Sequence, residues 1–426
     1  MIRSSIFLQN SLVLFAGTML ANILNYVFHF AMGRMVEPAV YGEMESIVSL
    51  LTIVTVPGTA IALIATRYAA TAKARNDIDL SINLFRKLNK KIFLYGFPFF
   101  LLALLTTPWV AQFLKVEHEM AIVFLWTMMF LSFFGSVATG MLNGWQKFFW
   151  VGGVNVVSSF TKLFSATLLV FLGFAVDGIV GAFLLSSLIG YGVSLWVLGR
   201  MKKKHEQDVP KKALVQEEGE KTSFRAYALP VLFASLAIAL LGNIDMVLAK
   251  YHLDPDQAGS YGALFIVSKT IFFFAGILTA VMFSMSAEEH EKNGKKENHQ
   301  SSVFRKSFTL ISIFCFLSVV FFVLFPKFVL GVFFGETYLH ASSYLGWFAL
   351  ASALYTLVHF LSQYLLSIGR TGIAWAMLFV ALLEIPILFF LGEDIMSIIV
   401  FVIIFQSITL LLGGAFIWKN RYKQVS

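Results

Sequence analysis

The sequence predicts an all-α polytopic membrane protein with twelve transmembrane helices in two pseudo-symmetric six-helix lobes. Of its 426 residues, 58% are hydrophobic and only 13% are charged, a composition that water-soluble globular proteins do not have. Almost the whole length divides into apolar runs of about 20 residues, the length that an α-helix needs to cross the hydrocarbon. The runs lack the period-two alternation of a transmembrane β-barrel.

The predicted helices follow one another through short connections. They cover residues 11–33, 44–66, 92–111, 120–142, 150–173 and 178–199 in the first half, and 227–250, 261–287, 307–325, 341–368, 373–391 and 395–418 in the second. The second helix contains Pro57-Gly58, where a missing backbone N–H and a missing Cβ permit a kink. The third and fourth are rich in Phe, Leu and Gly and are predicted to pack or to face lipid.

A hydrophilic stretch divides the chain into two halves. Residues 200–225 hold eight basic and five acidic residues, and we interpret them as a cytoplasmic linker between an N-terminal lobe, residues 1–199, and a C-terminal lobe, residues 226–426. When the chain is overlaid on itself with a shift of 220 residues, Asn25 falls on Asp245 and Tyr41-Gly42 falls on Tyr261-Gly262. The common order of runs and connections supports two copies of one unit.

The basic residues indicate topology rather than nucleic-acid binding. The connections after odd-numbered helices hold only Arg34, Lys115, Lys250 and Lys327, whereas the termini and the even-numbered connections hold 26 of the 32 Lys and Arg residues. This asymmetry predicts a multi-pass protein of the cytoplasmic membrane with both termini in the cytoplasm, and attraction to anionic membrane lipids. A cleaved signal peptide is not expected, and the lone Cys315 excludes a disulfide within the chain.

Enzymatic motifs are missing from the sequence. It contains no GxxxxGK[ST] phosphate loop, no HExxH, no GxSxG and no GxGxxG after a strand. The outward connections are also too short for the polar catalytic loop of a membrane-bound polymerase or glycosyltransferase. We therefore predict a protein that is not an enzyme and has no cofactor beyond a coupling Na⁺ or H⁺.

Two carboxylates inside apolar runs suggest a coupling site. Asp245 and Glu384 are the only acidic residues well inside the predicted helices, and Pro386 lacks the N–H that would bond the carbonyl of Leu382. A carboxylate beside a free carbonyl suits a hard cation or a proton. The alternative is that Asp245 pairs with Lys269 and that Glu384 is protonated. The residues that could complete the site are Gln406 and Thr409.

Two lysines near mid-depth suggest a site for an anionic passenger. Lys162 and Lys269 lie one in each lobe, where a lone charge costs at least about 2.5 kcal/mol, and they could meet the phosphate of a lipid head group. The alternative is that Lys269 pairs with Asp245 and that Lys162 extends toward the interface. Further candidate contacts to the substrate are Asn25 and His29 on one face of the first helix, Arg34 at the outer mouth and Arg67 at the inner end of the second helix.

The chain resembles a known family of flippases. The resemblance rests on Asn10-Ser11 through Gly33-Arg34, Val40-Tyr41-Gly42, Asn243-Ile244-Asp245 and Gly259-Ser260-Tyr261-Gly262, a pattern similar to the polysaccharide transporter family. This family belongs to the superfamily that includes multidrug and toxin extruders and the lipid II flippase. The resemblance implies two lobes around a central cavity, alternating access, and a sodium site among helices 7, 11 and 12, here Asp245, Glu384 and Thr409.

The resemblance also implies a cargo and partners. We expect a secondary transporter that moves polyprenyl-diphosphate-linked oligosaccharide to the outer leaflet for cell-surface polysaccharide synthesis, alongside a polysaccharide polymerase and glycosyltransferases of the same pathway. The competing interpretations are a multidrug extruder or a lipid II flippase of the same fold, and, from another class, a membrane polymerase or glycosyltransferase.

Overall fold

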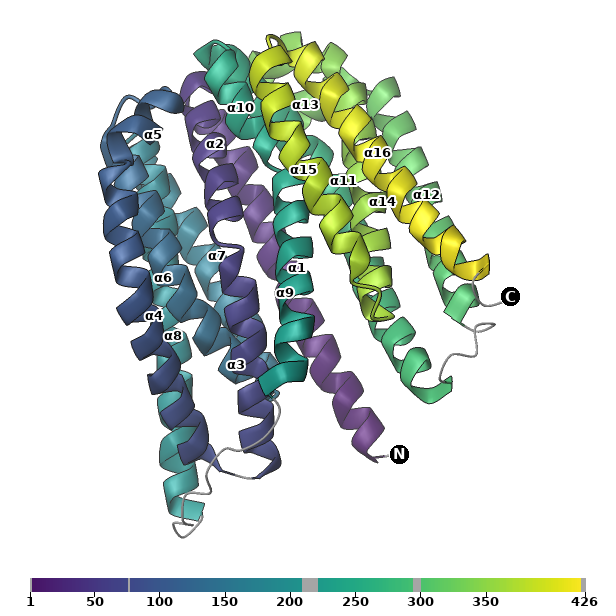
Figure 1. Cartoon of the computed structure of the whole chain (residues 1–426). Helices are drawn as coiled ribbons and strands as arrows, with labels where there is room; N and C mark the ends of the chain where they lie inside the picture. The colour runs from purple at the N-terminus through teal and green to yellow at the C-terminus, as the bar shows by residue number, and fades with distance from the viewer. Residues whose placement is uncertain (1, 76, 209–220, 294–299, 423–426) are drawn as a thin grey trace. The chain divides into compact units, whose positions relative to one another are not determined.

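The computed structural model describes residues 2–75, 77–208, 221–293 and 300–422 (Figure 1). Over these ranges the chain is helical and has no strand. The helices are α1 (Ile2–Met35), α2 (Pro38–Val54), α3 (Pro57–Ala74), α4 (Ile78–Leu105), α5 (Thr107–Phe113), α6 (Glu119–Gly144), α7 (Phe148–Phe171), α8 (Val176–Asp208), α9 (Lys221–Leu241), α10 (Ile244–His252), α11 (Pro255–Asn293), α12 (Gln300–Leu324), α13 (Pro326–Phe334), the 3₁₀ helix η1 (Glu336–Tyr344), α14 (Leu345–Ser367), α15 (Gly372–Leu391) and α16 (Ile395–Tyr422).

The described helices confirm the predicted number of membrane spans. Eleven are long and apolar enough to cross a membrane, and the bent pair formed by α2 and α3 makes a twelfth. The axes of this pair differ by 46°. The bend lies where Pro57 opens α3, so the kink expected at Pro57-Gly58 is present. Proline has no backbone N–H to continue the hydrogen bonds of the preceding helix.

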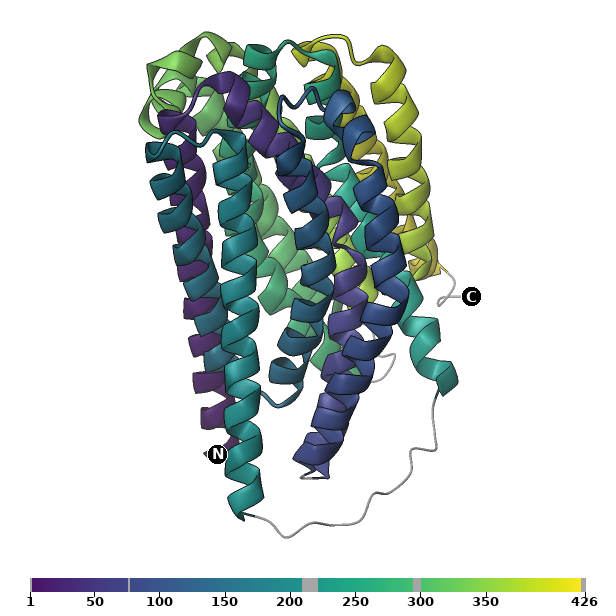
Figure 2. The same cartoon turned by 90° about the vertical axis from the view of Figure 1, so that its left-hand side faces the viewer.

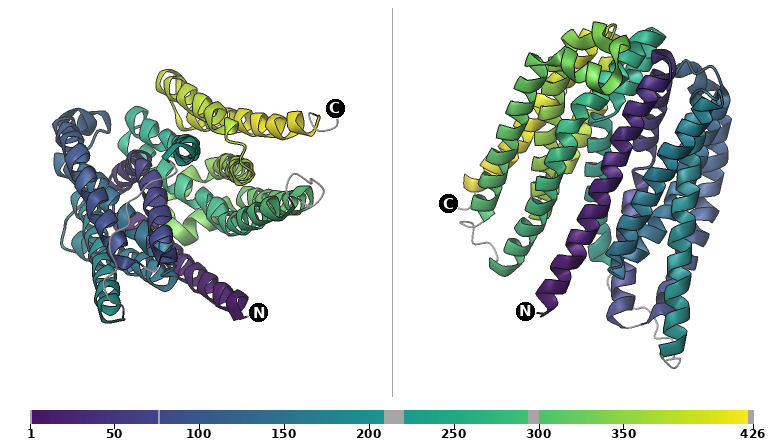
Figure 3. Two further views of the ribbon diagram at one scale, coloured as in Figure 1. Left: turned by 60° about the horizontal axis from the view of Figure 1, so that its bottom comes forward. Right: turned by 180° about the vertical axis from the view of Figure 1, so that it is seen from behind.

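The chain forms two compact units. The N-terminal unit contains Met1–Val36 and Val54–Phe224, and the C-terminal unit contains Glu37–Ile53 and Arg225–Ser426. In the N-terminal unit, α3 packs on α6, α1 on α7, and α8 on both α6 and α7 (Figure 2). In the C-terminal unit, α14 packs on α11, α12 and α16, and α15 on α16 (Figure 3).

Small residues set the closest helix contacts of the N-terminal unit. A Cβ atom at Gly140 would lie 2.5 Å from the carbonyl oxygen of Ala62, and one at Gly144 would lie 2.5 Å from that of Thr66. In a membrane, where lipid is as apolar as the helix surface, such close backbone approach is a principal source of helix association. The glycines of α6 therefore explain why α3 lies directly against it.

One segment packs differently from its position in the sequence. Residues 37–53, which the sequence-based division places in the N-terminal lobe, belong by packing to the C-terminal unit. The interior of this segment, including Tyr41 and Met44, is fully buried there. The segment consequently lies against α11, where a Cβ atom at Gly262 would come within 3.2 Å of Glu45.

Candidate functional site

The candidate site is built around a break in a helix. The run predicted as one helix over 227–250 is interrupted, since α9 ends at Leu241 and α10 begins at Ile244. Gly242 lies in the break, and a Cβ atom there would come within 2.6 Å of the hydroxyl oxygen of Tyr355. Interrupted membrane helices expose backbone groups, and such breaks are tolerated only where protein or water satisfies them.

Side chains from three other helices and from the break itself satisfy the exposed carbonyl groups. The oxygens of Ala239 and Leu241 have lost their usual helical donors, whereas the oxygen of Ile238 also keeps its own, the backbone N–H of Gly242, at 3.1 Å. The donors are Tyr355 to Ile238 O at 3.1 Å, Asn243 to Ala239 O at 2.8 Å, Gln406 to Leu241 O at 2.7 Å and Lys269 to Gly242 O at 2.6 Å.

Lys269 is anchored to this break. Its ammonium group also donates to Oδ1 of Asn243 at 3.0 Å and lies 3.6 Å from the centre of the Phe265 ring. The charges of Asp245 and Glu45 act on it electrostatically. The direct hydrogen bonds of Lys269 thus go to Asn243 and the backbone, and Asp245 provides a nearby counter-charge.

The carboxylates of the site have unsatisfied oxygens. Asp245 is buried, and its Oδ2 accepts a hydrogen bond from Tyr261 at 2.8 Å. Glu384 is 0% exposed. Among the described residues, no hydrogen-bond partner reaches Asp245 Oδ1, either carboxyl oxygen of Glu384, or Gln406 Oε1. Ionised carboxylates and amide oxygens only accept, and buried acceptors are normally paired, so these oxygens call for a proton or a cation.

The two carboxylates also influence each other. The charge of Asp245 acts on Glu384, and two negative charges in a medium of low dielectric repel strongly unless a positive charge lies between them. No cluster of three or more His, Cys, Asp or Glu side chains that could hold a metal ion occurs in the described part of the chain.

The remaining predicted members of this group lie nearby in α15 and α16. Thr409 is buried and its hydroxyl donates to the carbonyl of Phe405 at 2.8 Å, which leaves its oxygen free to accept. Pro386 lies inside α15, and the helix continues to Leu391. The Asp245, Glu384 and Gln406 side chains thus converge from α10, α15 and α16.

A small pocket of about 30 Å³ opens onto this group within the C-terminal unit. Its apolar lining comes from α9, α11, α14 and α16, and its polar lining is Asp245, Ser268, Lys269, Ser352, Tyr355 and Gln406. This space has room for a water molecule or a small ion.

The substrate candidates of the N-terminal unit lie in different surroundings. Lys162 is only 8% exposed, and its ammonium group lies 4.5 Å from the ring centres of both Phe28 and Phe183. A cation between two aromatic faces is stabilised by both rings, and Lys162 would have to leave the rings to meet a phosphate. Asn25 and His29 of α1 are half-buried, and Arg34 and Arg67 are exposed.

Sequence reasoning missed three buried charges. Glu43 and Glu45 of α2 and Lys250 of α10 are all buried, with Glu45 and Lys250 each 1% exposed. Asp245 and Glu384, the only carboxylates well inside the predicted helices, are thus joined by two further buried carboxylates. Both glutamates fall at the start of an apolar run, where a helix end at the interface is the ordinary expectation, and Lys250 falls at the end of another. The sequence feature that pointed to this region was the Tyr-Gly pair, which occurs at residues 41–42 and again at 261–262.

Comparisons with known proteins agree with this architecture. The model of a family described as "Polysaccharide biosynthesis protein" matches residues 7–290. No curated protein matches the chain. Among solved structures, an inward-facing multidrug resistance MATE transporter of the MOP superfamily is similar at 13% identity and a TM-score of 0.72, with 93% of this chain and 95% of that chain covered.

Two further structures have the same fold. The lipid II flippase MurJ in an inward closed conformation is 14% identical, with a TM-score of 0.66 and coverage of 94% of this chain and 86% of its own. A MOP superfamily transporter from Pyrococcus furiosus, described as having a binding pocket of reverse polarity, is 16% identical, with a TM-score of 0.58 and coverage of 97% of this chain and 93% of its own.

Proposed function

Because this chain belongs to the polysaccharide biosynthesis protein family, we propose that it moves a polyprenyl-diphosphate-linked oligosaccharide across the cytoplasmic membrane by alternating access. Its solved relatives are transporters and a flippase, and the prediction that it is not an enzyme is confirmed. Both termini lie in the cytoplasm in this proposal, with a polymerase and glycosyltransferases of the same pathway as partners.

Coupling to a cation is supported by a set of unpaired oxygens in the C-terminal unit. Asp245 Oδ1, both oxygens of Glu384 and Gln406 Oε1 are buried acceptors without donors among the described residues. A Na⁺ ion or a proton would satisfy them and cancel the repulsion between the two carboxylates. Thr409 adds a further oxygen. Binding there biases the two access states only through a difference in affinity between them.

The two lysines within the helices support an anionic substrate. Lys162 lies in α7 of the N-terminal unit and Lys269 in α11 of the C-terminal unit, each in a span of apolar sequence. A diphosphate cannot enter hydrocarbon without compensation, and an ammonium group is a compact donor for phosphate oxygens. In this proposal α1 and α3 contribute secondary contacts to the substrate. The residues are Asn25, His29 and Arg34 of α1 and Arg67 of α3.

Transport in reconstituted vesicles tests the proposal. Purified protein in liposomes with a labelled lipid-linked oligosaccharide should exchange the lipid between leaflets, faster with an inward Na⁺ or H⁺ gradient than without one. Glu384→Gln should remove the dependence on the gradient. Glu393→Gln is the matched control, because Glu393 lies exposed in the connection after α15 and should behave as the unaltered protein.

Other outcomes would assign another activity. Growth of the sugar chain would identify a polymerase, and export of a cationic dye without lipid exchange would identify a multidrug extruder. Exchange that is equal with and without both gradients would refute the coupling site while leaving flipping intact.

A further inference from the structure

A cluster of aromatic rings joins the start of α7 to the last part of α8. Phe149 packs edge-on against Trp150 at 5.5 Å, and Trp150 packs edge-on against Trp196 at 5.4 Å between ring centres. Phe149 is 66% exposed and Trp196 is 47% exposed. Both helices belong to the N-terminal unit and are long and apolar enough to span a membrane. Exposed aromatic rings at the ends of such helices are typical of the level where lipid head groups meet the hydrocarbon.

A cation lies on this cluster. The guanidinium carbon of Arg200 is 3.9 Å from the centre of the Trp196 ring, and the Arg200 side chain is exposed. The two residues are four apart on α8, so they occupy one face of the helix. A guanidinium group over an aromatic face is held there by cation–π attraction. Its N–H donors lie at its edge, where they suit the oxygens of a phosphate group.

Two further basic side chains lie at the same end of these helices. Lys147 is exposed directly before α7, three residues from Trp150, and Lys203 is exposed one turn beyond Arg200 on α8. The contact between Trp150 and Trp196 brings the two helix ends together. Each basic residue at this level adds attraction to an anionic lipid surface, so the charges around the rings favour an anionic ligand.

Two glycines leave open space beside the tryptophans. Gly153 lies one turn from Trp150 on α7, and Gly192 lies one turn from Trp196 on α8. A Cβ atom at either glycine would meet nothing within 4 Å. These two glycines therefore do not serve close packing between helices, which is the role of other glycines in this unit. The missing side chains leave room for an apolar chain to lie against the helix backbone beside the rings.

The exposed residues of α8 follow a regular order toward this end of the helix. Leu188, Gly192, Trp196 and Arg200 are all exposed and follow one another at intervals of four residues, so they lie along one side of the helix. The line passes from an apolar side chain through an open position and an aromatic ring to a cation. A phospholipid has the same order of chemistry, from its acyl chains through the glycerol region to the phosphate.

We propose that this face of α7 and α8 binds one anionic phospholipid. The phosphate contacts Arg200, the glycerol region lies against Trp196 and Trp150, and an acyl chain covers Gly192. The predicted topology assigns this end of the helices to the cytoplasmic leaflet, whose surface is anionic. The site lies wholly within the N-terminal unit, and it depends neither on the proposed transport function nor on the coupling site.

Native mass spectrometry of the full chain measures this binding. Protein purified in detergent is titrated with phosphatidylglycerol and, separately, with phosphatidylcholine of the same acyl chains. The intensities of the free and lipid-bound ions give the apparent Kd of the first bound lipid. Phosphatidylglycerol should bind roughly tenfold more tightly or better, because it alone carries a net negative charge to meet the basic side chains.

Two variants test the two ends of the lipid, each with a matched control. Arg200→Gln should weaken phosphatidylglycerol binding by roughly tenfold, to a value near that of phosphatidylcholine. Arg75→Gln removes the same charge from an exposed residue that follows α3 and should have little effect. Gly192→Leu should weaken binding because its side chain fills the space of the acyl chain. Gly414→Leu is its control, since Gly414 is exposed on α16 and a Cβ atom there meets nothing within 4 Å.

Several results would overturn the proposal. One is equal binding of the two phospholipids to the unaltered protein, and another is unchanged phosphatidylglycerol binding in both Arg200→Gln and Gly192→Leu, with thermal unfolding showing that the variants are folded. An equal loss in Arg75→Gln and Arg200→Gln would show attraction by net charge alone, without a defined site. Displacement of the lipid by inorganic phosphate would identify an anion site instead, and displacement by a polyprenyl-diphosphate lipid would assign the face to the transported substrate.

Discussion

Removal of the Lys269 ammonium group tests whether it holds the helix break. Lys269→Met keeps most of the aliphatic stem, and with it contact with Phe265, but it removes the hydrogen bonds to Gly242 O and Asn243 Oδ1. A hydrogen bond that involves a charged group contributes about 1.5–3 kcal/mol, so the two bonds together set an upper range of about 3–6 kcal/mol. Lys269 is half-buried, and water can replace part of this loss. We therefore expect a destabilisation of about 2–4 kcal/mol.

Unfolding in detergent measures the effect. Cys315 is buried in α12, so its reaction with a thiol-reactive dye during heating reports the loss of structure in the C-terminal unit. Lys327→Met is the matched control, because Lys327 is exposed on α13 and its loss should change stability by less than about 0.5 kcal/mol. Asp245→Asn added to Lys269→Met should recover part of the loss, since it removes the charge left without its counter-charge. Equal stability of the Lys269→Met and Lys327→Met proteins would refute a structural role for Lys269.

Three further predictions address other parts of the molecule. Gly144→Ala should destabilise the N-terminal unit by about 1–3 kcal/mol through overpacking against α3. Gly135→Ala should not, because a Cβ atom there meets nothing within 4 Å. Thermal unfolding in detergent compares the two variants. Hydrogen bonds from the backbone and side chain of Ser397 lower the pKa of Asp394 at the start of α16. Asp394 therefore stabilises the folded protein above the ordinary carboxyl pKa, and this stabilisation is lost as the pH falls through the lowered value. The difference in stability between Asp394→Ala and the unaltered protein should narrow below about pH 4. Lys162→Met should slow lipid exchange in vesicles while leaving the unfolding temperature nearly unchanged, and undiminished exchange would remove Lys162 from the substrate path.

The helices could be predicted from sequence because lipid imposes a simple condition. Each span needs about 20 apolar residues, and the runs that meet this condition agree with the described helices. The break between Leu241 and Ile244 could not be predicted in the same way. Gly242 is an ordinary residue in an apolar run, and the break persists because Gln406 and Lys269 reach its carbonyl groups from distant parts of the chain.

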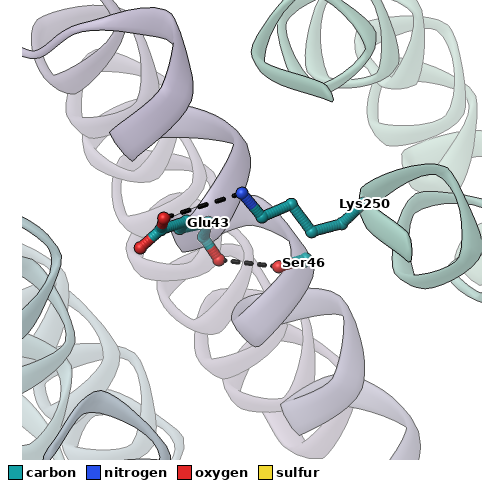
Figure 4. Close-up of polar contacts among 3 residues, drawn as sticks. All are labelled: Glu43, Ser46 and Lys250. Atoms are coloured by element: carbon teal, nitrogen blue, oxygen red, sulfur yellow. Dashed lines mark hydrogen bonds and ion pairs between the residues drawn. The ribbon is translucent and has the colours of Figure 1, made fainter. Parts of the chain in front are cut away.

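The packing of residues 37–53 within the C-terminal unit could not be predicted from the sequence for a related reason. Glu43 and Glu45 sit next to the start of an apolar run, and a charge there is normally exposed at the interface. Glu43 pairs with Lys250, far along the chain (Figure 4), and the glycines of α11 let residues 37–53 pack against it. The overlay of the two halves aligned Tyr41 with Tyr261, but a shared pattern does not show that one copy packs against the other.

The buried acidic and basic residues of the C-terminal unit are unequal in number, and this imbalance supports the proposed coupling site. Glu43 pairs with Lys250, and Glu45 shares Lys269 with Asp245. When both lysines are assigned to the α2 glutamates, Asp245 and Glu384 remain as two buried carboxylates with no basic side chain of their own. Only one of their four oxygens accepts a hydrogen bond from a described residue. In the proposed function, one bound proton or Na⁺ ion leaves one of these two negative charges uncompensated, whereas two leave none.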